Sequence, residues 1–251
     1  RLGAAERERI IRLVASSAGA PCDRERPIVS AELPGSGERF EGILPPVSEA
    51  PCFAIRKPAP APFSLDDYVE AGALAPAVSL ALRKALVARA NILIAGGTSS
   101  GKTTFANALL AEPCLAADRI VILEDTRELA CRAPDVTQLR AQPGSVSLRD
   151  LVRSTLRLRP DRIIVGEVRG GEALDLLKAW NTGHPGGLAT LHANSAGGVF
   201  SRLEQLVAEV TPSLPTGLIG EAIDIVVFLS RAGGQRRVEE ALRVTGFDEA
   251  G

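Results

Sequence analysis

The chain carries two patterns of hydrophobic and polar positions. Near the N-terminus, short runs alternate between apolar and polar side chains, as in Val29, Ala31 and Leu33, and prolines separate the runs. Alternation with a period of two is typical of half-buried strands, so this part is expected to form a small antiparallel sheet. A short amphipathic helix over residues 6–15 is predicted to precede it.

Beyond residue 63, short apolar runs are instead separated by segments of helical length. The runs cover residues 92–95, 120–123, 163–165, 188–191 and 225–229. Strands that alternate with helices predict a parallel α/β sheet. We therefore predict an N-terminal α+β domain over residues 1–57, a stiff proline-rich linker over residues 58–63 and an α/β domain over residues 64–251.

Composition narrows the class of protein. The 251 residues are 45% hydrophobic, which is enough for a substantial core, and the formal net charge of −1 provides no basic field for holding nucleic acid. No apolar run approaches the roughly 20 residues of a membrane span, and no signal peptide is visible. The four cysteines lack metal-ligand spacing and are expected to be reduced thiols in a cytoplasmic protein. Because the chain starts at Arg1 and contains no methionine, an N-terminal piece is expected to be missing.

A phosphate-binding motif follows the first apolar run. Residues 96–103 read GGTSSGKT and match G-x-x-x-x-G-K-[ST] between a predicted strand and a predicted helix. The loop's N–H groups and the helix N-terminus would surround nucleotide phosphates. Lys102 would reach the β and γ phosphates, and the Thr103 hydroxyl would bind Mg²⁺. The predicted nucleotide contacts are Gly96, Gly97, Thr98, Ser99, Ser100, Gly101, Lys102, Thr103 and Thr104.

Three other apolar runs end in a reactive side chain, namely Glu124, Glu167 and His192. Ligands of open parallel sheets bind at the carboxyl ends of the strands, so these side chains are expected to converge on the phosphate loop. Glu167 would hold magnesium, directly or through water, and Glu124 would orient or deprotonate the attacking water, although the two roles could be exchanged. His192 would sense the γ-phosphate or position a neighbour. For each acid, the alternative is a solvent-facing residue after a strand.

Arginines at helical spacing leave two interpretations open. Arg149, Arg153 and Arg157 are four residues apart and form one stripe. The stripe is either a solvated basic face or an inter-subunit face that presents arginine to a neighbour's nucleotide.

Together these motifs resemble the secretion-ATPase superfamily, and most closely its conjugal-transfer and type IV secretion branch with the TrbB-type ATPases. The segments that carry the resemblance are residues 96–104 (Walker A), 122–129 (aspartate box), 156–170 (Walker B) and 182–194 (histidine box). Gly166 replaces the usual Walker B aspartate, which is also a habit of this family.

The resemblance covers residues 40–247 and implies a RecA-like P-loop domain that hydrolyses ATP with Mg²⁺. It implies a homohexameric ring at the cytoplasmic face of the inner membrane, peripheral to it, working with secretion or conjugation apparatus proteins. It also implies that Arg56 contacts the γ-phosphate region and that Arg159 lies near the nucleotide. Part of the family's N-terminal domain is expected to be absent.

Three rival functions differ in what they require. An ATPase of a type II secretion or type IV pilus system often carries a four-cysteine metal site after Walker B, and the sequence has no such set. A non-catalytic scaffold would need a damaged phosphate loop or missing acids at the strand ends. A nucleic-acid motor is disfavoured by the balanced charge and by a single Trp and a single Tyr, so no sequence-specific nucleic-acid binding is expected.

Overall fold

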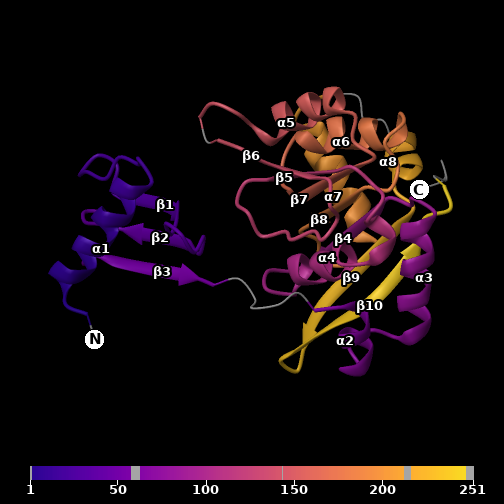
Figure 1. Ribbon diagram of the computed structural model, residues 1–251, viewed down its shortest axis with the longest axis horizontal. Coiled ribbons are helices and arrows are strands. Elements are labelled where there is room, and N and C mark those ends of the chain that lie inside the picture. Colours follow the sequence, from indigo (N-terminus) through magenta and orange to yellow (C-terminus); the bar gives the residue numbers. More distant parts are fainter. Residues whose placement is uncertain (1, 58–62, 143, 212–215, 247–251) are drawn as a thin grey trace. The chain divides into compact units, whose positions relative to one another are not determined.

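A computed structural model describes the chain except for residues 1, 58–62, 143, 212–215 and 247–251 (Figure 1). It contains two compact units, Arg1–Pro60 and Ala61–Gly251. Most of the predicted proline-rich linker falls on residues 58–62, outside the described residues, so the linker stays a prediction.

The N-terminal unit consists of helix α1 (Ala4–Ser17) and an antiparallel sheet with the order β1 (Ile28–Glu32), β2 (Arg39–Ile43), β3 (Cys52–Arg56). Its core joins Ile11 of the helix to Val29 and Phe40 of the sheet, all nearly inaccessible to solvent. Gly42 lies under the helix, where a Cβ atom would come within 2.9 Å of the Ile11 side chain. Gly42 thus allows the helix and the sheet to approach closely.

The C-terminal unit is built on a seven-stranded sheet with the order β10-β9-β4-β8-β7-β5-β6. Its strands are β4 (Ile92–Gly96), β5 (Ile120–Glu124), β6 (Val136–Arg140), β7 (Arg162–Val168), β8 (Leu188–Leu191), β9 (Ile225–Ala232) and β10 (Gln235–Arg243). All neighbours are parallel except β9 and β10, which form an antiparallel hairpin at one edge. The predicted parallel α/β sheet is therefore confirmed, and the predicted apolar runs are its central strands.

The two edge strands are not predicted by the apolar runs of the sequence. β6 reads VTQLR and β10 reads QRRVEEALR, so neither is a continuous apolar run. Edge strands have a neighbour on one side only and tolerate polar and charged side chains, which also protect the edge from pairing with other chains. A search for apolar runs cannot find such strands.

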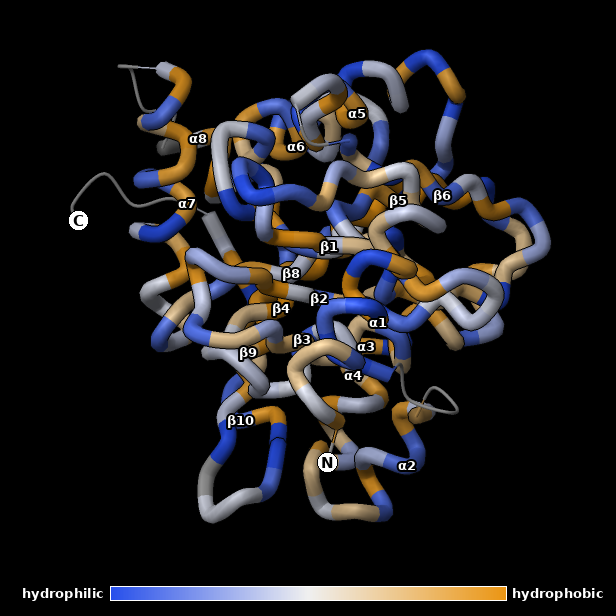
Figure 2. Tube along the Cα trace, turned by 90° about the vertical axis from the view of Figure 1, so that its left-hand side faces the viewer, coloured by the Kyte–Doolittle hydropathy of each residue, from blue (hydrophilic) through white to orange (hydrophobic). Residues whose placement is uncertain are grey.

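Helices cover both faces of this sheet. They are α2 (Leu65–Glu70), α3 (Pro76–Val87), α4 (Lys102–Leu110), α5 (Leu148–Thr155), α6 (Glu172–Asn181), α7 (Gly198–Ala208) and α8 (Thr216–Ala222), with 3₁₀ turns η1 (Pro113–Leu115) and η2 (Leu156–Leu158). Along β4, Ile92 and Ile94 join the core shared with α2–α4, whereas Leu93 and Ala95 join the core shared with α5–α8. In Figure 2, α7 alternates between hydrophobic and hydrophilic residues, as expected of a helix with one buried side. Within the described part of the chain, no helix is both long and apolar enough to cross a membrane.

Buried polar groups hold the amino ends of the strands together. Arg162, the first residue of β7, is 2% exposed and donates to Asp118 Oδ2 at 2.5 Å, Gly186 O at 3.1 Å and Leu86 O at 2.8 Å. The Asn91 side chain donates to Ala222 O at 2.9 Å and accepts from Gly187 N at 2.9 Å. Because buried charges and amides are costly unless paired, these contacts fix the end of the sheet opposite the phosphate loop.

Replacing Asp118 with alanine should destabilise the fold strongly. Asp118→Ala leaves the buried Arg162 guanidinium without its carboxylate, and breaking a buried pair in this way costs about 3–5 kcal/mol. Urea denaturation at neutral pH measures the loss. The matched control is Asp135→Ala, which removes an exposed ion pair with Arg119 (3.2 Å) and should cost about 0–1 kcal/mol. Equal effects of the two variants would show that Arg162 does not depend on Asp118.

Candidate active site

The phosphate-binding motif forms a tight loop between β4 and α4. Gly96 has φ +153° and Gly101 has φ +98°, angles that favour glycine. A Cβ atom on Gly96 would also collide with Leu229 O of the neighbouring β9 and lie 2.7 Å from Ser100 Oγ. Both glycines therefore occupy positions that a side chain would disturb. Gly101 is followed directly by Lys102, the first residue of α4, so the helix N-terminus points into the loop.

Lys102 is folded back over this loop. Its side chain is buried, with Nζ 3.0 Å from Gly96 O and 3.1 Å from Gly97 O. The same nitrogen lies 3.4 and 3.5 Å from the two ring nitrogens of His192, at the end of β8. Burial lowers the pKa of Lys102, and the negative charge of Glu167 opposes that change. The ammonium group is thus held by weak neutral acceptors, which an anion could replace.

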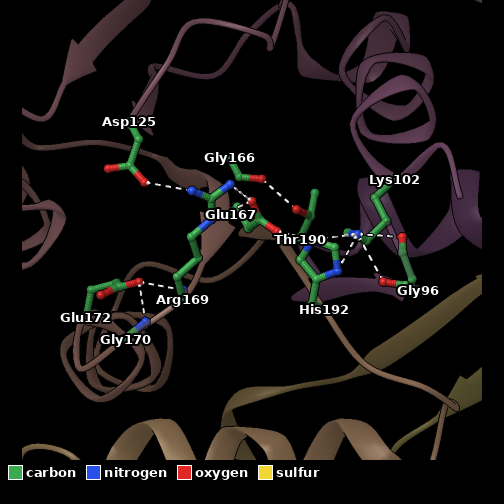
Figure 3. A network of polar contacts seen from close by, with 11 residues as sticks. Gly96, Lys102, Asp125, Gly166, Glu167, Arg169, Gly170, Glu172, Thr190 and His192 are labelled. Carbon is green, nitrogen blue, oxygen red and sulfur yellow. Dashed lines mark hydrogen bonds and ion pairs between the residues drawn. The ribbon is translucent and has the colours of Figure 1, made fainter. Parts of the chain in front are cut away.

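Glu167 lies at the centre of a network of charged groups (Figure 3). Arg169 Nε donates to Glu167 Oε2 at 2.7 Å, and a second guanidinium nitrogen also contacts that oxygen. His192 Nε2 lies 2.8 Å from Glu167 Oε1, at ion-pair distance but not in line for a hydrogen bond. Burial lowers the pKa of His192, the positive charge of Lys102 lowers it further, and Glu167 opposes both effects. Lys102, Glu167 and His192 come together at one end of the sheet, as the convergence of strand ends requires.

Glu124 lies deeper than Glu167. It is 2% exposed, whereas the Glu167 side chain is 18% exposed. Glu124 Oε1 accepts hydrogen bonds from the backbone N–H groups of Glu128 and Leu129, both at 2.8 Å, and its Oε2 is buried without a hydrogen-bond partner among the described residues. Burial raises the pKa of Glu124, and the two N–H groups oppose that rise. The carboxylate therefore anchors the start of the loop that follows β5.

The position of Glu124 explains the glycine in the Walker B segment. A Cβ atom on Gly166 would lie 2.9 Å from Glu124 Cγ and 3.4 Å from its Oε1. The Glu124 side chain thus occupies the space beside residue 166 that an aspartate at that position would need.

The C-terminal unit does not bring Arg159 to this site, and Arg56 belongs to the N-terminal unit. Arg159 follows η2 and precedes β7, and Glu167 is near the other end of that strand. At roughly 3.3 Å per residue, Arg162 and Glu167 alone are about 17 Å apart, so Arg159 lies toward the opposite end of the sheet. Arg56 ends β3 in the N-terminal unit, so its predicted contact with the γ-phosphate stays a prediction.

Other positively charged candidates have structural partners. Arg149 and Arg153 of α5 donate to the two carboxylate oxygens of Asp175 on α6, at 2.6 and 3.0 Å. This pairing favours the interpretation of the arginine stripe as an ordinary helix face.

Sequence reasoning missed Arg169 and Thr190 as members of the site. Arg169 stands two positions after Glu167, a spacing that could have suggested a shared face of an extended segment. Thr190 Oγ1 donates to Gly166 O at 2.7 Å and ties β8 to β7 next to Glu167. A threonine inside an apolar run carries no sign of that contact.

Comparison with known proteins agrees with this geometry. The profile of the family described as Type II/IV secretion system protein matches residues 21–239. The conjugal transfer protein TrbB of Rhizobium radiobacter is 51% identical over 242 residues, covering 96% of this chain and 75% of the relative. The type IV secretion system protein VirB11 of Bartonella henselae is 32% identical over 277 residues, covering 92% and 77%.

Solved structures show the same fold. The VirB11 ATPase of the Brucella suis type IV secretion system aligns with TM-score 0.60 and 29% identity over 92% of this chain and 77% of that structure. The pilus retraction motor PilT aligns with TM-score 0.66 over 92% of this chain and 69% of that structure, and at 21% identity it supports the fold alone. The resemblance seen in the sequence motifs is therefore confirmed: the chain belongs to the type II/IV secretion system protein family.

Proposed function

We propose that this chain is a P-loop ATPase that powers a conjugative transfer or type IV secretion machine. The observation that carries the proposal is the buried Lys102 ammonium at the phosphate loop, 3.0 Å from Gly96 O, with Glu167 and His192 beside it. A fixed cation, a helix N-terminus and an acid at one sheet end are the parts that phosphoryl transfer needs. The TrbB and VirB11 relatives favour conjugation or type IV secretion over type II secretion or pilus assembly.

The residues present fit a bound nucleotide. Gly96 and Gly101 keep the loop free of Cβ atoms, and the Ser100 hydroxyl is buried without a partner among the described residues. Lys102 would exchange the carbonyls of Gly96 and Gly97 for phosphate oxygens. Thr103, in the first turn of α4, and Glu167 would hold Mg²⁺, which neutralises charge on the phosphates.

Glu167 and Glu124 would have different roles because they differ in solvent exposure. Glu167 is the more exposed acid, and its present partners are cationic or ionisable groups that can move, namely Arg169 and His192. We assign to Glu167 the contact with magnesium and the attacking water. Glu124 would add buried negative charge and keep the loop at residues 128–129 in place. His192, next to both Lys102 and Glu167, would respond to the γ-phosphate.

We infer that the chain works as a ring of six identical subunits, and the placement of the arginines supports this proposal. Arg159 precedes β7 and lies toward the end of the sheet opposite the phosphate loop of its own chain, so a role at a nucleotide would require a neighbouring subunit. Arg56 would complete the site from the N-terminal unit. We place the ring at the cytoplasmic face of the inner membrane, in contact with proteins of the secretion or conjugation apparatus.

Lys102→Ala should abolish ATP hydrolysis while leaving the fold intact. The lysine stabilises charge on the transferring phosphoryl group, and its present partners are the carbonyls of Gly96 and Gly97 and the His192 ring, none of which the fold depends on for its core. Phosphate release and circular dichroism measure activity and folding. Lys84→Ala, on the exposed face of α3, is the matched control and should keep wild-type turnover. Normal turnover of a folded Lys102→Ala protein would contradict the assignment of the phosphate loop.

Glu167→Gln should bind ATP but hydrolyse it about 10²- to 10⁴-fold more slowly, because the change removes the charge that acts on the attacking water and keeps the shape. Nucleotide titration and single-turnover hydrolysis separate the two effects. Glu70→Gln, on the exposed side of α2, controls for the loss of one negative charge. Weaker ATP binding with a normal chemical step would argue against this role.

Gly166→Ala should destabilise the protein by about 1–3 kcal/mol, because the added methyl group overlaps Glu124. In a Glu124→Ala background the same change should cost less than half as much, since the overlapping atoms are gone. Denaturant midpoints of the four proteins in this cycle give the coupling. Gly217→Ala in α8, where a Cβ atom meets open space, is the control and should be neutral or stabilising. Additive effects would contradict the overlap.

Mixing inactive Lys102→Ala subunits with wild type should lower ATPase activity more steeply than dilution does, because arginines of one subunit complete the site of the next. Activity is measured at increasing ratios under conditions that favour assembly, and Lys84→Ala subunits serve as the matched mixing partner. Sedimentation with ATP gives the assembly state. Activity proportional to the wild-type fraction, from a protein that sediments as a monomer, would refute the ring.

A further inference from the structure

The β9–β10 hairpin extends beyond the strand that carries the phosphate loop. β9 pairs with β4 up to Leu229, which lies opposite Gly96, and then continues to Ala232. β10 returns antiparallel from Gln235, with Arg236 opposite Arg231. The end of the hairpin therefore overhangs the loop, at the edge of the sheet beside α2 (Figure 1).

Arg236 lies along the outside of the loop. Its Nε donates to Ser99 O at 3.1 Å, and its Cδ lies 3.0 Å from the place that a Cβ atom on Gly101 would occupy. Among the described residues no carboxylate lies within ion-pair distance of its guanidinium group, so Ser99 O is the polar partner that holds the side chain. Burial raises the pKa of Tyr68 to about 12, and the positive charge of Arg236 opposes that rise.

Contacts with α2 and the segment after it support the β9–β10 hairpin that carries Arg236. The Tyr68 ring, in α2, lies 5.2 Å from the ring of Phe105 in α4 and meets it edge-on. Val238 N of β10 donates to Ala73 O at 2.8 Å, which ties the hairpin to the segment after α2. The backbone of β10 near Arg236 is thus tied to the segment after α2. Ser99, by contrast, belongs to the phosphate loop, whose shape the binding of an anion depends on.

The contact with Ser99 O sets the direction of the next N–H group. Ser99 has φ +61°, a left-handed conformation that is unfavourable for a residue with a side chain. In a planar trans peptide, the carbonyl of Ser99 and the N–H of Ser100 point in opposite directions. With the carbonyl held outward by Arg236, Ser100 N–H turns into the loop and donates a hydrogen bond to Gly97 O, with 3.3 Å between nitrogen and oxygen. A phosphate-binding loop needs its N–H groups to point inward in this way.

We propose that Arg236 is a positioning residue that holds the phosphate loop in its anion-binding conformation before the nucleotide arrives. This inference rests on the proposed ATPase function. Since preorganisation lowers the conformational cost of binding, the effect of Arg236 falls on nucleotide affinity. The ground state and the transition state both use the loop, so KM changes more than kcat.

The test compares Arg236→Ala and Arg236→Lys with the matched control Arg237→Ala. Arg237 carries the same charge on the adjacent position of β10, where side chains point to the opposite face, and it pairs with Ser230. Hydrogen exchange of the amides at residues 96–103 is measured without nucleotide, and Kd, KM and kcat are measured for ATP. Arg236→Ala should speed loop exchange and raise Kd and KM about tenfold, the scale of one hydrogen bond from a charged donor, with kcat within about twofold. Arg236→Lys, which keeps a charged donor on a flexible chain, should recover part of both losses.

The outcomes separate this inference from the proposed function. The inference would be overturned if Arg236→Ala and Arg237→Ala had the same loop exchange and the same Kd. It would also be overturned if Arg236→Ala lowered kcat and left KM unchanged. Failure of the wild-type protein to bind ATP would refute the proposed function instead. Loop exchange would then still decide the inference, because unchanged exchange in Arg236→Ala would show that Arg236 does not hold the loop.

Discussion

A single buried ammonium group at the carboxyl end of a parallel sheet is the feature on which the rest of the site depends. The Lys102 side chain is buried, and burying an ammonium group is costly unless it is hydrogen-bonded. The loop meets part of this cost with the carbonyls of Gly96 and Gly97, and the neighbouring strand ends contribute His192 and the field of Glu167. A site arranged in this way is prepared for an anion, which would satisfy the same charge better than neutral carbonyls do.

The two ends of the sheet have different physical roles. At the amino ends, Asp118 and Arg162 form a buried pair, and Asn91 joins backbone groups before β8 and β9. At the carboxyl ends, the Glu167 side chain is 18% exposed, and its partner Arg169, at 57% side-chain exposure, can be exchanged. Stability is therefore concentrated at one end and adjustable chemistry at the other, as expected for an open α/β sheet.

At two positions of the site, the space available for a side chain, rather than charge, favours glycine. Gly96 lies against Leu229 O, and Gly166 lies against the Glu124 side chain. At Gly166, the missing side chain and the buried glutamate are two parts of one arrangement, since either side chain fills the same volume. The absence of a Walker B aspartate is therefore a consequence of packing between β5 and β7 and does not mean that the site lacks negative charge.

The sequence by itself determined the parallel sheet, its central strands and the position of Lys102, Glu167 and His192 at one end of the sheet. These features are local: apolar runs define buried strands, the glycine pattern defines the loop, and strands of one direction must end at one edge. The tertiary structure alone decided which residues of distant segments touch. It showed the polar edge strands β6 and β10, the pairing of Arg169 with Glu167 and the contact of Arg236 with the loop. It also showed that Arg159 precedes β7, toward the end of the sheet opposite the phosphate loop. Such contacts depend on strand order and register, and no periodicity along the chain encodes which strands become neighbours.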